Sequence, residues 1–144
     1  MQLHILDENE DKFDDLFASA EAQQLLEIYD EYYPRIGFEP PWVAYLVIEA
    51  GEVLGTGSFT GTPQDGVVEI AFWTFPEFQG QGVASYVCRQ LVGIAQDEDP
   101  EVVITAKTAP GPNPSTRILE NNGFVYRKIV EDDEIGDAWL WVHQ

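Results

Sequence analysis

The sequence is poor in cysteine, in basic residues and in long apolar runs. Its single cysteine, Cys88, excludes an internal disulfide. Only 7 Lys and Arg stand against 26 Asp and Glu, a net charge of −19, which argues against a protein that binds nucleic acid through its phosphates. No apolar run approaches the ~20 residues of a membrane span, and the first residues lack the basic and apolar regions of a signal peptide. We therefore expect a cytoplasmic protein without nucleic-acid or membrane partners.

What the sequence does contain suits one globular domain. The chain has 144 residues, near the commonest domain size, and 44% of them are hydrophobic. No linker, repeat or low-complexity tract divides it, which predicts a single domain over residues 1–144. The acidic excess either serves solubility or attracts a cationic substrate such as an amine. With one Cys and two distant histidines, His4 and His143, no metal site is expected.

Hydrophobic periodicity predicts a mixed α/β sheet. The predicted strands are 2–6, 43–50, 53–60, 67–75, 101–106, 124–130 and 138–143. The predicted helices are 11–31 in two pieces, 84–96 and 113–122, and the proline-rich stretch 32–42 is predicted as a loop. Strand 67–75 is apolar on nearly every position and is predicted to be central and covered on both faces.

A glycine-bearing turn, Gln79-Gly80-Gln81-Gly82-Val83-Ala84, separates strand 67–75 from helix 84–96. A helix N-terminus offers unpaired N–H groups to an anion, and glycines let a phosphate approach the backbone. The turn lacks the Lys-Ser/Thr of a P-loop, and Ser85 stands where a dinucleotide fingerprint has its third glycine. By itself the pattern fits an ordinary strand–helix turn equally well.

Two motifs resemble those of the GNAT superfamily of N-acetyltransferases. Gln79-x-x-Gly82-x-Ala84 resembles the Gln/Arg-x-x-Gly-x-Gly/Ala motif, and the run 68–78 is similar to the strand that leads into it. The segment 113–124, with Asn113, Ser115 and a Leu-Glu-x-x-Gly-Phe ending, resembles a helix of the RimJ/RimL-like branch. The resemblance is close over residues 67–130. It implies a GNAT-type, mostly antiparallel mixed sheet with a splayed parallel strand pair, flanked by helices, and acetyl-CoA as cosubstrate.

The resemblance also implies where acetyl-CoA binds. The pantetheine arm is expected to pair with strand backbone between the splayed strands, here at Phe72, Trp73 and Thr74. The remaining cofactor contacts are expected at Gln79, Gly80, Gln81, Gly82, Val83, Ala84, Ser85 and Asn113. Arg89, in the following helix, is either a phosphate ligand or a solvent-facing side chain.

The implied reaction is direct attack of an amine on the acetyl thioester. It needs a base for the ammonium, a donor for the oxyanion and an acid for the leaving thiolate. Glu69 is the candidate base, since a partly desolvated carboxylate accepts a proton more readily; a structural ion pair is the alternative. A backbone N–H near Trp73 or Thr74 is the candidate oxyanion donor. The usual tyrosine acid is replaced by Leu119, which leaves Ser115, unless Ser115 and Asn113 only cap the helix.

Acceptor and partners are less defined by the sequence. The acceptor is expected to be a small amine or a peptide N-terminus, and the ten Asp and Glu before Tyr33 suit a cationic one. Tyr32, Tyr33 and Trp42 either border the acceptor or pack under a loop. Trp139-Leu140-Trp141 is a candidate homodimer interface. A non-catalytic acyl-CoA-binding sensor or assembly module of the same fold is the alternative function.

Overall fold

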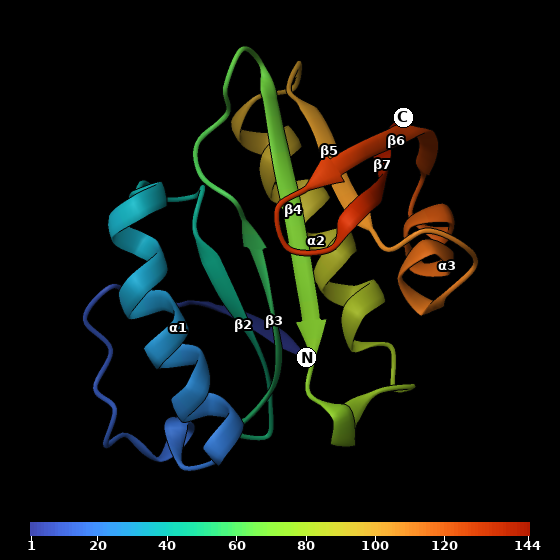
Figure 1. Cartoon of the computed structure of the whole chain (residues 1–144). Helices are drawn as coiled ribbons and strands as arrows, with labels where there is room; N and C mark the ends of the chain where they lie inside the picture. Colours follow the sequence, from blue (N-terminus) through green and yellow to red (C-terminus); the bar gives the residue numbers. More distant parts are fainter.

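A seven-stranded sheet with helices on both faces makes up the computed structural model, which describes residues 1–144 (Figure 1). The strand order is β1-β2-β3-β4-β5-β7-β6, and every neighbouring pair is antiparallel except β4–β5. The predicted mixed, mostly antiparallel sheet with one parallel pair is confirmed. The strands are β1 Gln2–Ile5, β2 Ala44–Glu49, β3 Glu52–Phe59, β4 Val67–Thr74, β5 Val103–Thr108, β6 Phe124–Asp132 and β7 Gly136–His143.

The two longest helices, α1 and α2, pack on opposite faces of this sheet. They are the short η1 Asp15–Phe17 and η2 Pro76–Phe78 and the longer α1 Ala20–Ile36, α2 Val83–Glu98 and α3 Pro114–Asn121. Figure 1 shows α1 beside β2 and β3, and α2 behind β4. One core lies under α1, where Leu25 packs near Leu46 of β2, and the other lies under α2. None of the helices combines the length and hydropathy needed to cross a membrane.

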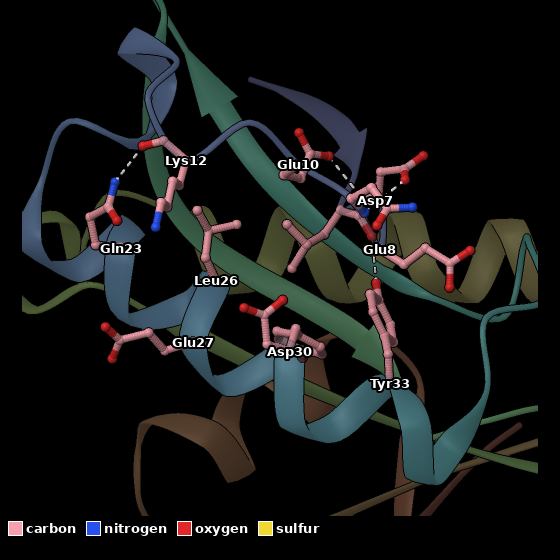
Figure 2. Close-up of a pocket in the computed structure, with 12 residues that line it drawn as sticks. Asp7, Glu8, Glu10, Lys12, Gln23, Leu26, Glu27, Asp30 and Tyr33 are labelled. Atoms are coloured by element: carbon pink, nitrogen blue, oxygen red, sulfur yellow. Dashed lines mark hydrogen bonds between the residues drawn. The ribbon is translucent and has the colours of Figure 1, made fainter.

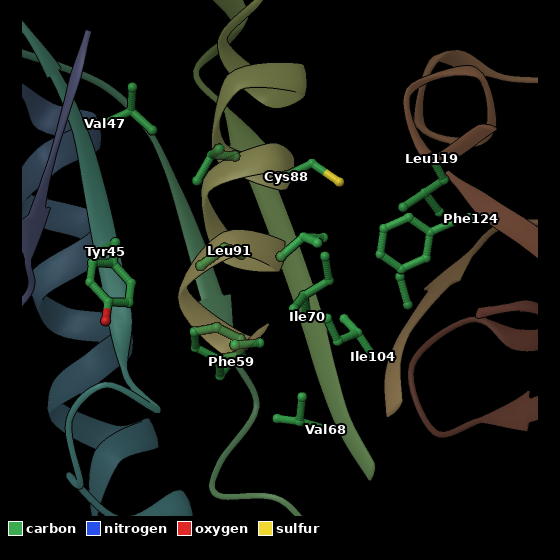
Figure 3. Close-up of a cluster of buried hydrophobic side chains, with 14 of the residues drawn as sticks. Tyr45, Val47, Phe59, Val68, Ile70, Cys88, Leu91, Ile104, Leu119 and Phe124 are labelled. Atoms are coloured by element: carbon green, nitrogen blue, oxygen red, sulfur yellow. The ribbon is translucent and has the colours of Figure 1, made fainter. Parts of the chain in front are cut away.

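The second core, drawn in Figure 3, brings α2 close to the sheet. Cys88 and Leu91 of α2 and Ile70 of β4 are almost fully buried there. At Gly57 of β3 there is no room for a side chain, because a Cβ there would overlap the side chain of Val87. This glycine therefore sets how closely α2 approaches β3.

The prediction that residues 32–42 form a loop is wrong in its first part, because α1 continues to Ile36 through Pro34. Proline removes one helical N–H donor and crowds the preceding turn. The neighbouring Tyr33 stabilises the helix here, because it is buried and its hydroxyl donates to the Leu6 carbonyl at 2.6 Å and accepts from the Ala44 N–H at 3.2 Å. Gly37, with φ of +85°, ends the helix.

The prediction that β4 is covered on both faces is also wrong. Val68 and Ile70 are buried on the α2 side, whereas Ala71 is exposed on the other face and Trp73 keeps 41% of its surface exposed. The core under α1 contains residues of η1, β2 and β3 and Leu6, which follows β1; from the region of β4 it contains only Phe75, the residue after the strand. Apolar composition alone did not reveal that this face is open.

The parallel strands β4 and β5 separate partway along their length. They pair from Val67 with Val103 to Ile70 with Ala106, and no further. Beyond this point, β4 pairs only with β3, and β5 pairs only with β7. The strands thus open a gap beside residues 71–74 of β4, as the splayed pair was expected to do.

Candidate active site

Backbone groups of β4 point into the gap at alternate residues. Phe75 donates its N–H to β3, and the Glu69 carbonyl accepts from Thr60 beyond the end of β3. Backbone groups of successive residues on a strand point to opposite sides. The N–H and C=O groups of Phe72 and Thr74 therefore face the gap, and those of Trp73 face β3. Of the two positions expected for an oxyanion donor, this excludes Trp73 and leaves Thr74, and it adds Phe72.

A cleft of about 780 Å³ runs from this gap to the start of α2. Its walls come from β4, the turn after it, the first turn of α2 and α3. The lining residues are Phe72, Trp73, Thr74, Phe78, Gln79, Gly80, Gly82, Val83, Ala84, Ser85, Pro114, Ser115, Arg117 and Ile118. Nine of the predicted cofactor-binding residues line this cleft together with Ser115. Gln81 and Asn113 do not, and Phe78, Pro114, Arg117 and Ile118 are additions that the sequence did not indicate.

The turn before α2 presents a row of unused N–H groups. Gly80 and Gly82 adopt φ of +80° and +82°, where side chains are strained, and nothing lies within 4 Å of a Cβ built at either. Gly82 is the N-cap of α2 and offers no side chain to cap it. The N–H groups of residues 80–85 donate no hydrogen bond within the chain. Unpaired donors at a helix N-terminus suit a diphosphate.

A second unsatisfied group lies in the same cleft. The Thr74 hydroxyl oxygen is buried and has no hydrogen-bond partner, although buried polar side-chain atoms are normally paired. Thr74 also faces the gap with its backbone groups, as argued above. The residues present therefore fit an extended ligand with amides and a diphosphate, such as acetyl-CoA.

The charge of the cleft is opposite to that of the chain as a whole. No Asp or Glu lines it, although the chain has 26 of them, and Arg117 of α3 is its only Lys or Arg. Arg89, the cation weighed from the sequence, is exposed on α2 and is not among the lining residues. An anionic ligand is thus favoured in this cleft over the rest of the surface.

The start of α3 separates two predicted site residues. Asn113 is the N-cap: its side-chain oxygen accepts from the Thr116 N–H at 3.0 Å, and the Thr116 hydroxyl accepts from the Asn113 N–H at 3.0 Å. Such a capping box accounts for Asn113 fully. Ser115 lines the cleft and its hydroxyl makes no hydrogen bond within the chain, so it does not cap the helix. Leu119, where a tyrosine was sought, is fully buried.

Glu69 lies outside the cleft, on the open face of β4. Its Oε1 is 3.3 Å from the Nζ of Lys107, and the same Nζ is 3.8 Å from Oδ1 of Asp132. The Glu69 side chain keeps 29% of its surface exposed, so its desolvation is partial. The structural alternative considered for Glu69, an ion pair, is thus present, and a base next to a cation is compatible with it. Lys107 gave no sequence signal because the pair depends on the β4–β5 register.

One aromatic residue of α1, Tyr32, is close enough to Glu69 to be affected by its charge. Burial, and next the negative charge of Glu69, raise the pKa of the Tyr32 phenol, so Tyr32 lies near this carboxylate. Tyr33 and Trp42 instead pack in the cores, Trp42 edge-on to Phe59 with ring centroids 5.0 Å apart. Of the three aromatic residues weighed for the acceptor site, only Tyr32 is partly exposed, so only Tyr32 stays a candidate for bordering it.

Cys88 and Trp141 belong to the core. Burial raises the pKa of the Cys88 thiol to about 12, which agrees with a packed, unreactive cysteine. Trp141 is 3% exposed, and its indole N–H donates to the Thr108 hydroxyl at 3.0 Å. Trp141 is therefore not exposed, whereas Trp139 and Leu140 are half-buried, and a homodimer interface at residues 139–141 stays a prediction.

A second, smaller cleft of about 350 Å³ lies on the far side of α1 from the gap. Figure 2 shows its side chains, which come from the loop after β1 and from α1. Its carboxylates are Asp7, Glu8, Glu10, Glu27 and Asp30, with Lys12 as its one cation. No cluster of three or more His, Cys, Asp or Glu is arranged to hold a metal ion.

Comparison with known protein families identifies the family of the chain. The family described as "Acetyltransferase (GNAT) domain" matches residues 7–125. No curated protein sequence matches the chain significantly.

Solved acetyltransferases share the fold at low sequence identity. A Vibrio cholerae and human chimera of spermidine N-acetyltransferase is 16% identical with a TM-score of 0.71, over 99% of this chain and 95% of that one. The Salmonella typhimurium enzyme that modifies the N-terminal serine of ribosomal protein L7/L12 is 18% identical with a TM-score of 0.63, over 85% and 73%. A GNAT-family acetyltransferase of Bacillus anthracis is 16% identical with a TM-score of 0.65, over 84% and 73%. Because the family match spans most of the sequence, the chain belongs to the GNAT family of acetyltransferases, with RimL-type enzymes among its structural neighbours.

Proposed function

We propose that residues 1–144 form a single domain that transfers the acetyl group of acetyl-CoA to an amine by direct attack. The observation that carries the proposal is the cleft, where unused N–H groups at residues 80–85 meet a gap between parallel strands. A structural neighbour, a RimL acetyltransferase, is described in complex with coenzyme A. Acetyl-CoA supplies an acetyl group activated as a thioester.

Binding is assigned to backbone groups and to a few side chains. The turn from Gln79 to Ser85 holds the diphosphate through its N–H groups and the helix dipole. Phe72 and Thr74 pair with the amides of the pantetheine arm, in the manner of an added strand, and the Thr74 hydroxyl gains the partner that it lacks. Arg117 adds the one positive charge of the cleft.

Three groups of the chain are assigned to the chemistry. Glu69 takes the proton from the acceptor ammonium, because an amine attacks only through its free electron pair. The N–H of Phe72 stabilises the oxyanion, since it is the first gap-facing N–H beyond the last β4–β5 pair at Ile70. The hydroxyl of Ser115, which is free of other bonds in the cleft, protonates the leaving thiolate.

The acceptor is proposed to be a cationic amine, of the polyamine or peptide N-terminus class. The net charge of −19 attracts cations to the protein as a whole, and the carboxylates of the cleft beside α1 add to this attraction. The neighbours act on both classes, one on spermidine and one on a ribosomal protein N-terminus. A non-catalytic acyl-CoA-binding module remains the rival, because the buried Leu119 cannot act as an acid.

Release of free CoA from acetyl-CoA with polyamines, peptides and amino acids tests the proposal. Glu69→Gln should lower kcat by roughly 10²-fold with unchanged affinity for acetyl-CoA, since a general base contributes about that much. Glu52→Gln, an exposed carboxylate of β3, is the matched control and should turn over normally. Undiminished turnover of Glu69→Gln across pH removes this base. Tight acetyl-CoA binding with no turnover on any amine supports the module instead.

A further inference from the structure

One lysine of the chain sits at the mouth of the gap. Lys107 is the first residue of β5 after Ala106, which makes the last pair with β4. Its side chain lies on the same face as Glu69, whose carboxylate is 3.3 Å from the lysine Nζ. An ammonium at this distance from the proposed base can pass its proton directly to it.

The other two lysines lack this environment. Lys128 of β6 is in register with Leu140, and Leu140 is in register with Lys107, so both lysines belong to one row across the sheet. Because neighbouring strands are about 4.8 Å apart, the backbone of Lys128, two strands away, lies roughly 10 Å from that of Lys107. Lys128 is exposed and makes no ion pair, and Lys12 lies over the ring of Phe13 near the acidic cleft.

We propose that Lys107 is itself an acetyl acceptor, so that the chain acetylates its own Lys107 when acetyl-CoA is bound and no external amine is present. This rests on the proposed function. Glu69 accepts one proton from the Lys107 ammonium, and the freed electron pair attacks the thioester carbon. The new C–N bond forms, the C–S bond breaks, and the products are an amide on Lys107, free CoA thiol and one released proton.

Acetylation at this position changes the charge around Glu69. The amide cannot make the contacts that the ammonium makes to Glu69 and Asp132, so both ion pairs end. Asp132 then keeps only its bonds to the N–H groups of Glu134 and Ile135. The modified chain presents two uncompensated carboxylates on the open face, which favours the arrival of a cationic acceptor.

The test is incubation of the full chain with acetyl-CoA alone, followed by intact mass measurement and peptide mapping. Lys107 should be acetylated roughly 10²-fold faster than Lys128, the advantage of a positioned base. The rate per chain should not change with protein concentration, because the transfer occurs within one chain. Lys107→Arg, which keeps the charge but accepts no acetyl group, should abolish the product, and Lys128→Arg should leave it. Glu69→Gln should slow acetylation of Lys107 by roughly 10²-fold.

The outcomes separate this inference from the proposed function. Turnover with added amines but no acetyl group on Lys107 overturns the inference and leaves the proposed function standing. Equal labelling of Lys12, Lys107 and Lys128, or a rate that rises with protein concentration, also overturns it. If no CoA is released from acetyl-CoA, either without an added amine or with any amine tested, both the inference and the proposed function are wrong.

Discussion

Replacement of Thr74 by valine separates ligand binding from folding. Thr74 is 8% exposed and its hydroxyl oxygen has no partner. Valine keeps the shape and removes the hydroxyl. In proteins, burial of an unpaired hydroxyl costs about 1–3 kcal/mol. Thr74→Val should therefore stabilise the free chain by up to that amount, and Tm should rise by about 2–4 °C for each kcal/mol gained.

The same substitution should weaken the binding of acetyl-CoA. If the ligand supplies the missing partner of the Thr74 hydroxyl, its loss removes one hydrogen bond, worth about 1 kcal/mol. This corresponds to about a fivefold increase in the Kd for acetyl-CoA. Thr56→Val is the matched control on the neighbouring strand: Thr56 is 6% exposed, and its hydroxyl donates to the Tyr45 carbonyl at 2.9 Å. This variant should lose about 1 kcal/mol of stability and bind the ligand normally.

Thermal unfolding with and without acetyl-CoA measures both effects, and calorimetry gives the Kd. The expected pattern is a higher Tm for free Thr74→Val and a smaller rise in Tm with ligand, because a bound ligand stabilises according to its affinity. If Thr74→Val is destabilised like Thr56→Val, the hydroxyl is not an unsatisfied group. If the rise in Tm with ligand equals that of the wild type, the hydroxyl does not bind the cofactor.

Three further substitutions test the packing and the buried hydrogen bonds of the fold. Gly57→Ala should cost about 1–3 kcal/mol in urea unfolding, because the new Cβ overlaps Val87 and pushes α2 from β3. Gly93→Ala, an exposed position in α2 with free space around it, should instead gain about 0.5–1 kcal/mol, and equal effects at the two glycines would contradict this reasoning. Tyr33→Phe should cost about 1–3 kcal/mol at neutral pH, because the Ala44 N–H and Leu6 carbonyl lose a partner. Burial raises the pKa of Tyr33 above its ordinary value of 10.0. As the pH rises past 10.0, the unfolded chain loses the phenol proton while the folded chain keeps it, which favours unfolding. The difference in free energy of unfolding between the wild type and Tyr33→Phe should therefore shrink above pH 10.0. An advantage constant with pH would refute this.

The features that the sequence predicted are those with local causes. Glycines at 80 and 82, between an apolar strand and a helical pattern, predicted a turn open to phosphate, and the structure shows unused N–H groups there. Alternation and turn residues located all seven strands to within a few positions. Asn113 has the residue type and spacing of an N-cap, and it is one.

The features that the sequence missed depend on contacts between distant residues. Pro34 reads as a helix end, but the buried bonds of Tyr33 to β2 and to the residue after β1 hold the helix through it. The apolar strand around Trp73 predicted that its side chain is buried, but its exposure depends on how far α1 extends across the sheet. Glu69 and Lys107 meet only because the β4–β5 register brings them together. Arg117 gave no signal because a helical arginine does not reveal which side of the helix faces a cleft.

The separation of β4 from β5 has a consequence for the behaviour of the free protein in solution. A sheet of seven strands normally exposes two edges, but this gap adds unpaired backbone inside the sheet, where Phe72 and Thr74 lack partners on the side of β5. An unpaired edge is a template for a foreign strand and hence for aggregation. A cofactor that lies in the gap covers this edge as it binds, so the protein without cofactor should be the form that is prone to aggregate.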